Sequence, residues 1–393
     1  MNRRTAAVVA GLGAAILGAG HVAADPPPVC QDPALVQLEA DYIAAAQYVN
    51  SKDNASGAIN TIAGPPTAVV PRESAFAILG LLRAADCLAN AAYRTRAQNA
   101  MEYLLRVQDQ QGGWFDQYRY EKPSLRSESA SQAAAVMIAL NELGFAKKRF
   151  GAMVKAGEFL LSMQDPLHKT GADDGLVGAG LDDRGRYLTS RTAVDNALAY
   201  QAFKAAARWA RIMKVVPHEQ RFEDAAARVL DGINDVLNDP ATPVWYSAVD
   251  AQGHSLTTQH DASNYSPQLF DVPADGAGAA AVGEWIVQTL VHQPEGGAVW
   301  NDGPQNNRLS PGYSFQACLV WIDLHQFVPY DAARAWANGS GLHQTTPDAN
   351  GVRGGWIDWK ETAGAQAQPW ERFIGASAFS ILAATDGFDF SAE

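Results

Sequence analysis

Apolar residues recur with a helical period along nearly the whole chain, and patterns typical of strands are almost absent. One set of segments is amphipathic and covers residues 33–50, 93–109, 149–164, 219–237, 278–291 and 330–338. A second set is rich in small residues and more uniformly apolar, at 73–89, 128–143, 190–212, 312–327 and 371–384. The two sets alternate. A further apolar segment is due near residues 263–272, where the pattern is weak.

This alternation predicts a repeat of helical hairpins. A helix that is apolar on all sides belongs inside the fold, and an amphipathic helix belongs outside. Six hairpins close into a double ring, so the sequence predicts an all-α protein with an (α/α)6 toroid of inner and outer helices. A right-handed open solenoid is the alternative. We expect residues 25–393 to form this single domain.

The connections between helices are asymmetric. A link from an inner to an outer segment is short, as in "GFAKKR" at residues 144–149. The links from outer to inner segments are long, at 51–72, 110–127, 165–189, 239–262, 292–311 and 340–370. Long loops in a compact domain are usually functional. The end of the ring that carries these loops is therefore the expected location of a site.

The long loops share glycines followed by large aromatic residues, as in "QGGWFDQY" (111–118), "GGAVW" (296–300) and "GGWIDW" (354–359). Flat aromatic faces at the rim of a depression suit the apolar C–H faces of sugar rings. The alternative is that each ring packs its own loop onto the helices. The aromatic candidates for sugar binding are Trp114, Tyr118, Tyr187, Trp245, Trp300, Tyr313, Trp356 and Trp359.

Arginines recur where the inner helices begin, although a helix N-terminus is already positive. Two explanations remain open: ion pairs with neighbouring carboxylates, or contacts with an anionic ligand. Arg126 and Arg191 are the candidates for substrate binding, and Arg72, Arg308 and Arg372 occupy similar positions.

The N-terminus has the pattern of a secretory signal peptide. Arg3 and Arg4 precede an apolar stretch, and "VAA" (22–24) provides small residues for cleavage before Asp25. We therefore expect residues 1–24 to be removed and the mature protein to be secreted or periplasmic; a permanent membrane anchor is the alternative. No later run approaches the length of a membrane span.

Composition narrows the partners and cofactors. The formal net charge of −12 disfavours a nucleic-acid partner, and the chain carries no CxxC or HExxH zinc motif. Export permits a disulfide, for which Cys30 and Cys87 are the candidates, while Cys318 is expected to be a buried thiol. No cofactor is expected, apart from a candidate Ca²⁺ site in the acidic loop that holds Asp173, Asp174, Asp182 and Asp183. We expect a monomer.

Three resemblances follow from these motifs. "RAQNAMEYLLRVQDQQGGW" (96–114) resembles the QW repeat of squalene and oxidosqualene cyclases, and its Gly-Gly-Trp corner is similar to that of secreted toroidal pectate lyases. "TSRTAVDNALAYQAFKAAARWA" (189–210) looks like an inner helix of six-hairpin glycosidase-type proteins, in which an acidic residue and asparagine open a helix on the cleft. These resemblances imply a toroid and a carbohydrate-active enzyme.

The glycosidase resemblance implies hydrolysis of a polysaccharide or oligosaccharide by two carboxyl groups that face each other across a cleft. We expect Glu128 to be the general acid and Asp195 the base, because they open consecutive inner helices. Helix capping or an ion pair is the alternative role for each. Other carboxylates at this end are Glu73, Asp116, Asp261, Asp302, Asp358 and Glu371.

Three other functions remain open. A pectate-type lyase would remove the proton next to a uronate carboxylate, with Arg or Ca²⁺ neutralising the charge. A terpene cyclase would need a DxDD motif, which the chain lacks. A non-catalytic toroid would bind glycans or a protein. His254 and His260, in a long loop, are further candidate acid/base groups, with solvent-exposed positions as the alternative.

Overall fold

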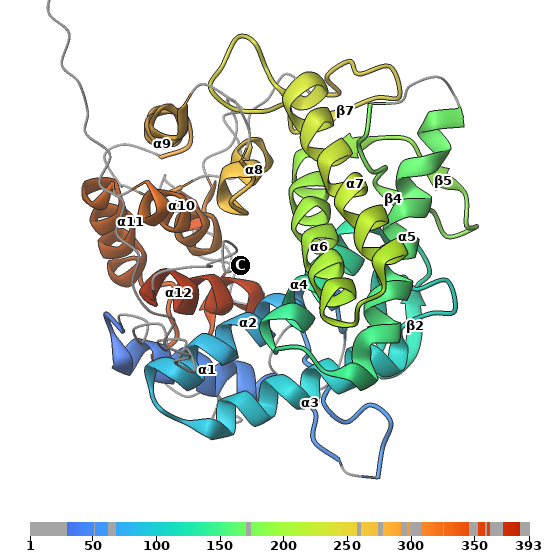
Figure 1. Cartoon of the computed structure of the whole chain (residues 1–393). Helices are drawn as coiled ribbons and strands as arrows, with labels where there is room; N and C mark the ends of the chain where they lie inside the picture. The colour runs from blue at the N-terminus through green and yellow to red at the C-terminus, as the bar shows by residue number, and fades with distance from the viewer. Residues whose placement is uncertain are drawn as a thin grey trace, which may run out of the picture.

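The computed structural model describes residues 30–50, 52–61, 68–169, 174–257, 261–273, 278–291, 297–298, 308–324, 326–345, 353–357, 360–361 and 372–385. Within this part of the chain, helices form two concentric rings (Figure 1). The inner ring consists of α2 (Pro71–Cys87), α4 (Ala130–Glu142), α6 (Ala193–Ile212), α8 (Ser266–Leu269), α10 (Pro311–Asp323) and α12 (Ile374–Ala384). The outer ring consists of α1 (Pro33–Ala46), α3 (Ala91–Val107), α5 (Phe150–Lys169), α7 (Val216–Gly232), α9 (Gly278–Thr289) and α11 (Phe327–Gly339).

The ring is closed, because each inner helix contacts the next and α12 packs against α2. The two ends of the described chain meet at this closure: the Gln31 amide donates to the Ala384 carbonyl at 3.0 Å. A disulfide joins Cys30, just before α1, to Cys87 at the end of α2, and Cys318 is a buried free thiol. The structure thus confirms the (α/α)6 toroid, rather than an open solenoid, and the expected cysteine pairing.

Burial separates the two rings as the sequence pattern predicts. Every residue of α4 from Ala130 to Leu140 is buried, and so is the whole of α12. The outer helices bury one face only; α7, for example, buries Phe222, Ala225, Ala226, Val229 and Gly232. The inner helices are therefore surrounded by protein on all sides, which explains why their side chains are small and apolar all round.

The weak signal near residues 263–272 reflects a short inner helix. A 3₁₀ turn at Ala262–Tyr265 leads into α8, which spans only four residues. Pro267 lies in the first turn of α8, where its missing N–H costs nothing. The helix ends at Leu269, Phe270 is its C-cap, and Asp271 follows with a left-handed φ of 49°. One turn is too short for helical periodicity to show in the sequence.

The long loops contain short antiparallel strands. β1 (Gln117–Arg119) pairs with β2 (Lys122–Leu125), and β3 (Glu128–Ser129), β4 (Gly180–Leu181) and β5 (Tyr187–Leu188) form a small sheet. β6 (Arg191–Thr192) pairs with β7 (Ala248–Val249). β8 (Arg308–Leu309) pairs with β10 (Lys360–Glu361), and β9 (Trp356–Ile357) with β11 (Arg372–Phe373). Several of these strands immediately precede inner helices, so they fix where those helices start.

A glycine in each of four long loops lies against the backbone of the next outer helix. Each has a left-handed φ, and a Cβ on any of them would overlap a carbonyl oxygen of that helix. The pairs are Gly57 with Asn99, Gly112 with Lys155, Gly175 with Arg228, and Gly354 with Leu38. The last pair joins the sixth hairpin to the first. The glycines of the long loops therefore serve close packing between neighbouring hairpins.

A glutamine side chain accompanies three of these glycines. The amide of Gln108 donates to the Gly112 and Ala152 carbonyls, both at 3.0 Å. Gln47 donates to the Gly57 and Arg96 carbonyls, at 3.2 and 2.9 Å. Gln164 donates in the same way to Gly175 and Ala225. We call each such glycine, together with its glutamine, a corner clamp; it ties a loop to two successive hairpins.

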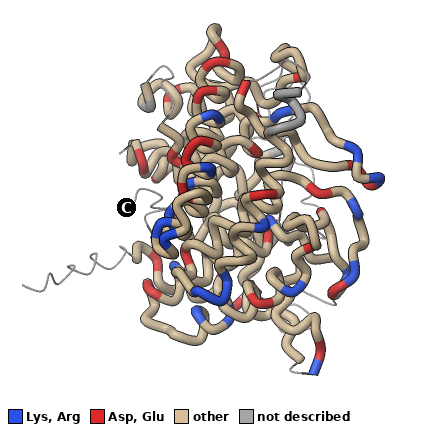
Figure 2. Tube along the Cα trace, turned by 45° about the vertical axis from the view of Figure 1, so that its right-hand side comes forward, with Lys and Arg blue, Asp and Glu red and all other residues tan. Residues whose placement is uncertain are grey.

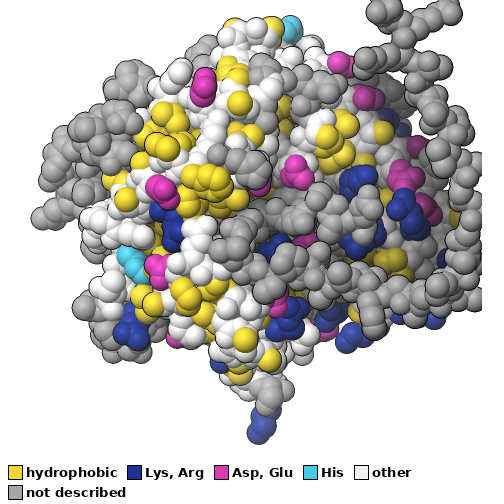
Figure 3. Space-filling view, turned by 60° about the vertical axis from the view of Figure 1, so that its left-hand side comes forward, with side chains coloured by type: hydrophobic (Ala, Val, Ile, Leu, Met, Phe, Trp, Pro, Cys, Tyr) yellow, Lys and Arg dark blue, Asp and Glu magenta, His cyan; other side chains and the backbone are white. Residues whose placement is uncertain are grey.

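Charges are spread over the outside of the ring. Lys, Arg, Asp and Glu are interspersed along the trace rather than segregated by sign (Figure 2). On the face shown in Figure 3, hydrophobic side chains form small groups separated by polar and charged ones. Among the helices that the structure describes, none combines the length and apolar character of a membrane span. The expected signal peptide, residues 1–24, lies outside the described residues.

Candidate functional site

A cavity of about 400 Å³ opens at the centre of the ring. It is lined by the N-terminal parts of α2, α10 and α12, the start of α6, and the segment from Asp261 through α8. The long loops lead into these helix starts, so the cavity lies at the loop-bearing end, as expected. Its volume falls within the range of about 300–1,000 Å³ that is typical of small-molecule sites.

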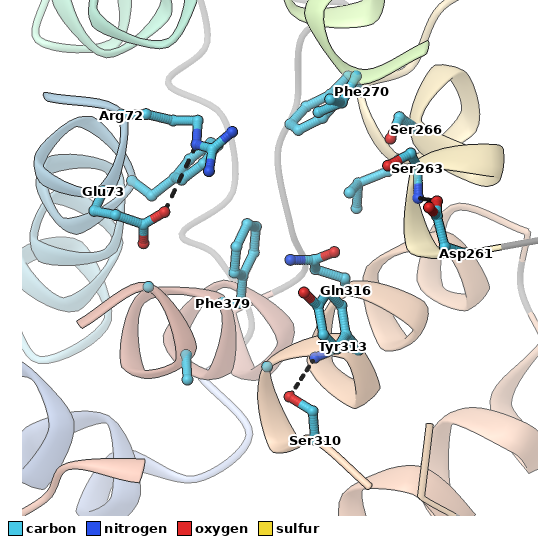
Figure 4. Close-up of a pocket in the computed structure, with 16 residues that line it drawn as sticks. Arg72, Glu73, Asp261, Ser263, Ser266, Phe270, Ser310, Tyr313, Gln316 and Phe379 are labelled. Carbon is cyan, nitrogen blue, oxygen red and sulfur yellow. Dashed lines mark hydrogen bonds and ion pairs between the residues drawn. The ribbon is translucent and has the colours of Figure 1, made fainter. Parts of the chain in front are cut away.

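Arg72 and Glu73 form one wall, in the first turn of α2 (Figure 4). The Arg72 Nε lies 3.7 Å from Glu73 Oε1. The Arg72 backbone N–H donates to the Gln132 side-chain oxygen of α4 at 2.6 Å, which anchors the start of α2 to the neighbouring inner helix. This wall therefore presents one guanidinium and one carboxylate side by side.

Asp261 lies on the opposite wall, with Ser263 and Ser266 (Figure 4). Its Oδ1 accepts hydrogen bonds from the Ser263 amide at 2.7 Å and from the Ser247 hydroxyl at 3.1 Å. The bond from Ser263 caps the 3₁₀ turn before α8, and the Asn264 side chain completes a capping box by accepting a hydrogen bond from the Asp261 backbone N–H at 2.6 Å. The position of the Asp261 carboxylate is therefore set by its role as the N-cap of the turn that leads into α8.

Three phenylalanines form an apolar surface between the two walls. The ring of Phe76 is stacked with that of Phe270, with centroids 6.3 Å apart, and lies 5.0 Å from that of Phe379. All three line the cavity and are largely buried. Tyr313 and Gln316 of α10 add polar side chains beside them (Figure 4). The cavity therefore combines apolar faces with hydrogen-bonding groups.

The structure places the expected pair Glu128 and Asp195 elsewhere: neither lines the cavity. The carboxyl of Glu128 lies against Gly113 and is buried, and its Oε2 has no hydrogen-bond partner among the described residues. Burial, with Asp109 and Asp116 nearby, raises its pKa to about 7. Glu128 therefore lies outside the cavity, enclosed beside its own loop, and its role as general acid with Asp195 as base stays a prediction.

Asp195 lies in the first turn of α6 and takes part in the capping of that helix by Thr192. Its backbone N–H donates to the Thr192 hydroxyl at 3.0 Å, and that hydroxyl donates to Asp195 Oδ2 at 2.6 Å. Burial raises the pKa of Asp195, while bonds from Thr192 and Ser131 and the charge of Arg72 act in the opposite direction. The capping alternative therefore describes its contacts.

Four of the expected aromatic platforms are buried within the fold. Trp114, Tyr118, Trp245 and Trp356 are at most 3% exposed. The Trp114 indole donates to the Leu104 carbonyl at 2.7 Å, and the Tyr118 hydroxyl to the Val107 carbonyl at 2.9 Å. The expectation that these four rings line the rim of a cleft is wrong, because they are packed inside the fold and do not line the cavity.

The remaining aromatic candidates have different outcomes. Tyr187 is half-buried and its hydroxyl donates to the Met163 carbonyl, so it too packs its own loop. Tyr313 is the one of this set that lines the cavity among the residues that can be placed. Trp300 and Trp359 lie outside the described residues, as do the candidates Asp302, Asp358, Glu371 and His260.

The two arginines chosen for substrate binding also lie away from the cavity. Arg191 is fully buried, where it pairs with the Asp174 carboxylate and donates to the Asp250 carbonyl. Arg126 is exposed and does not line the cavity. The ion-pair explanation therefore holds for Arg191, and Arg72 is the arginine that reaches the cavity.

The acidic loop is engaged with arginines. Asp174 pairs with Arg191, and Asp182 with Arg186, the second at 2.6 Å. Asp173 lies outside the described residues, and within the described part of the chain no cluster of three or more His, Cys, Asp or Glu side chains is arranged to hold a metal. Ca²⁺ at this loop remains a prediction.

Sequence reasoning passed over the three phenylalanines and Gln316. Phe76 and Phe379 belong to inner helices, where apolar residues are expected everywhere, so nothing in the pattern separates cavity-lining from core positions. Glu73 could have been preferred over Glu128 as a catalytic candidate. It follows Arg72 at the start of an inner helix, and it lies about one helical turn before Phe76, so the two side chains share a face of that helix.

Comparisons with known proteins agree on the fold. No protein-family model and no curated protein sequence matches the chain. Among solved structures, an alpha-amylase from Clostridium perfringens aligns with TM-score 0.65 at 11% identity, over 90% of this chain and 97% of that one. Cellobiose 2-epimerase from Bacillus thermoamylovorans aligns with TM-score 0.66 at 12% identity, over 88% and 97%.

A third structure is GH63 mannosylglycerate hydrolase from Thermus thermophilus in complex with glucose. It aligns with TM-score 0.58 at 12% identity, over 88% of this chain and 99% of that one. The chain therefore has the six-hairpin (α/α)6 toroid fold of these structures, with a polar and aromatic cavity at the loop-bearing end of its inner ring.

Proposed function

We propose that the chain is an exported glycoside hydrolase that acts on a polysaccharide or oligosaccharide and binds a sugar unit in the central cavity. The observation that carries this proposal is the placement of Glu73 and Asp261 on opposite walls of one cavity. The names of the similar structures, which include an alpha-amylase and a mannosylglycerate hydrolase, support a carbohydrate substrate.

The chemistry needs one carboxyl group to protonate the leaving oxygen and a second to attack the sugar or activate water. We assign the second role to Glu73, because Arg72 beside it interacts favourably with a negative charge. We assign the acid role to Asp261. The hydrogen bonds from Ser263 and Ser247 to its Oδ1 hold this carboxyl group on the wall opposite Glu73.

Several other cavity residues would bind the sugar. Phe76, Phe270 and Phe379 line the cavity and offer apolar contacts to C–H groups, and Arg72, Tyr313 and Gln316 offer hydrogen bonds to hydroxyl groups. This division between apolar faces and a few convergent polar groups is what sugar recognition requires.

The test compares Glu73→Gln with Asp261→Asn on a panel of neutral and anionic glycans and on nitrophenyl glycosides. Both variants should lose most of the activity on glycans. Asp261→Asn should keep much more activity on nitrophenyl glycosides, since a good leaving group needs no proton. Azide should restore activity to a Glu73 variant, because it can replace the missing base or nucleophile. Full activity on glycans in both variants would refute the assignment.

Arg72 favours a second candidate, β-elimination on an acidic polysaccharide, because a guanidinium in the cavity could neutralise a uronate carboxylate. The same panel separates the two reactions. A lyase creates a C=C bond that absorbs ultraviolet light, whereas a hydrolase releases reducing ends without that absorption. A sugar whose configuration changes without bond cleavage would indicate an epimerase or isomerase, and glycan retention without turnover a binding protein.

A further inference from the structure

Gly375 lies in the first turn of α12 and lines the cavity. A Cβ at this position would overlap Oε2 of Glu73, which reaches across from α2. Gly375 is absent from the glycines with a left-handed φ, so its backbone conformation would accept any residue. Glycine inside a helix lowers helix stability relative to alanine. The space taken by the Glu73 carboxylate is therefore the local reason for glycine here.

This contact gives each oxygen of Glu73 its own neighbour. Oε1 lies 3.7 Å from Arg72 Nε, and Oε2 lies against the first turn of α12. α12 is eleven residues long, and the N-terminal turn of a helix attracts negative charge. Of the first backbone N–H groups of α12, that of Ile374 donates to the Thr61 carbonyl at 3.1 Å. The carboxylate thus lies between an arginine on its own helix and the start of a different inner helix.

We propose that Gly375 is a positioning residue that seats the Glu73 carboxylate for hydrolysis. The inference rests on the proposed function, and it deepens that function by naming what holds the base or nucleophile in place. A displacement of a reacting group by about 1 Å can lower the rate by roughly 100-fold. An added methyl group at residue 375 should cause such a displacement.

Gly151 provides a matched control outside the cavity. It lies in the first turn of the outer helix α5, and its φ is not left-handed either. A Cβ at Gly151 would have no atom within 4 Å, and Gly151 does not line the cavity. Gly151→Ala therefore adds the same methyl group to the first turn of a helix without touching the Glu73 carboxylate.

The experiment measures kcat, KM and the pH dependence of kcat for Gly375→Ala, Gly151→Ala and the wild type. We expect Gly375→Ala to lower kcat by about 100-fold with a smaller change in KM, and to shift the acidic limb of the pH profile. Gly151→Ala should keep a kcat and a pH profile close to those of the wild type. Equal kcat values in the two variants, with an active wild type, would overturn the inference and leave the proposed function standing. An inactive wild type would instead overturn the proposed function.

A stability cycle tests the seating without any activity. The melting temperatures of the wild type, Gly375→Ala, Glu73→Ala and the double variant are compared. If Gly375 positions the Glu73 carboxylate, Gly375→Ala should lower Tm when Glu73 is present. When residue 73 is alanine, Gly375→Ala should raise Tm, as expected for a change from glycine to alanine in a helix. The same Tm change in both backgrounds would show that Glu73 and Gly375 are not coupled. If Gly375→Ala alone fails to fold, recovery of folding in the double variant would still support the seating.

Discussion

The indole Nε1 of Trp356 donates a hydrogen bond to Oε1 of Glu39 at 2.7 Å, and this bond links the loop before α12 to the first outer helix. The Ser380 hydroxyl of α12 donates to the same oxygen at 2.6 Å. The other carboxyl oxygen, Oε2, has no partner among the described residues. The tryptophan that the sequence suggests for a sugar platform thus helps to close the ring at its first and last hairpins.

Glu39 should make the stability of the protein depend on pH. Its complete burial raises its pKa from 4.5 to about 8, although bonds from Ser380 and Trp356 act in the opposite direction. Between these two values the unfolded chain releases a proton that the folded chain retains, so stability should fall as pH rises from about 4.5 to 8. We expect a loss on the order of 1 kcal/mol per pH unit.

Urea unfolding of the wild type and Glu39→Gln at pH 5, 6, 7 and 8 would measure this dependence. The variant cannot ionise at this position and should show a clearly flatter profile. Parallel profiles would mean that Glu39 is ionised in the folded state.

Glu128→Gln should leave turnover close to that of the wild type, because Glu128 does not line the cavity. Its pKa of about 7 instead predicts that the carboxyl costs stability as pH rises from 4.5 to 7, and glutamine should remove that part of the pH dependence. Rates and melting temperatures across this range, with Glu73→Gln as the inactive reference, would measure both effects. Loss of turnover in Glu128→Gln with an unchanged melting temperature would restore Glu128 as a catalytic candidate.

The corner clamps predict a difference between two glycines that share a left-handed φ. Gly112 has φ 100° and touches the Lys155 carbonyl, whereas Gly144 has φ 90° and would place a Cβ with no atom within 4 Å. Gly144→Ala should cost about 1–2 kcal/mol from backbone strain alone. Gly112→Ala should cost about 1–3 kcal/mol more, because the methyl group also overlaps α5. Chemical denaturation of both variants measures the difference; equal costs would show that the clamp contributes nothing.

Reduction of the Cys30–Cys87 disulfide should lower stability. The bridge spans 57 residues along the chain. A loop of this length corresponds to about 4 kcal/mol of chain entropy in the unfolded state. Thermal unfolding of the wild type with and without reductant gives the effect, and Cys30→Ser/Cys87→Ser should match the reduced wild type and be insensitive to reductant. A bridge-free variant as stable as the oxidised protein would contradict this estimate.

The architecture could be predicted because each helix carries its own signal. Apolar residues on every side mark α4 and α12 as inner helices, and a single apolar face marks α7 as an outer one. α8 was the exception, since four residues are too few to show a helical period. Local sequence patterns were therefore sufficient to predict the ring of helices. The position of the short helix α8 depends on packing against its neighbours, which the local sequence does not show.

The candidate site could be predicted only to the correct end of the ring. Trp114 and Trp356 are both aromatic residues after glycines, and whether such a ring faces solvent or the neighbouring hairpin depends on contacts that are remote in sequence. A repeated signal was available in the glutamines: Gln47 and Gln108 directly follow an outer helix, Gln164 lies in the C-terminal part of α5, and each precedes a clamp glycine. A glutamine followed by a loop glycine at each of these places indicates structural loops, and it would have directed attention away from the tryptophans.

The first and last described segments meet beside α12, and this bears on the order of the hairpins along the chain. Gln31 and Ala384 are hydrogen-bonded neighbours, so the circular arrangement of the hairpins does not depend on which hairpin comes first in the sequence. Circular permutation, with the old ends joined by a linker and a new opening at one of the tight inner-to-outer turns, would preserve every wall of the cavity. Removal of a single hairpin would not, because Glu73, Asp261 and Tyr313 are contributed by different hairpins and meet only in the complete circle.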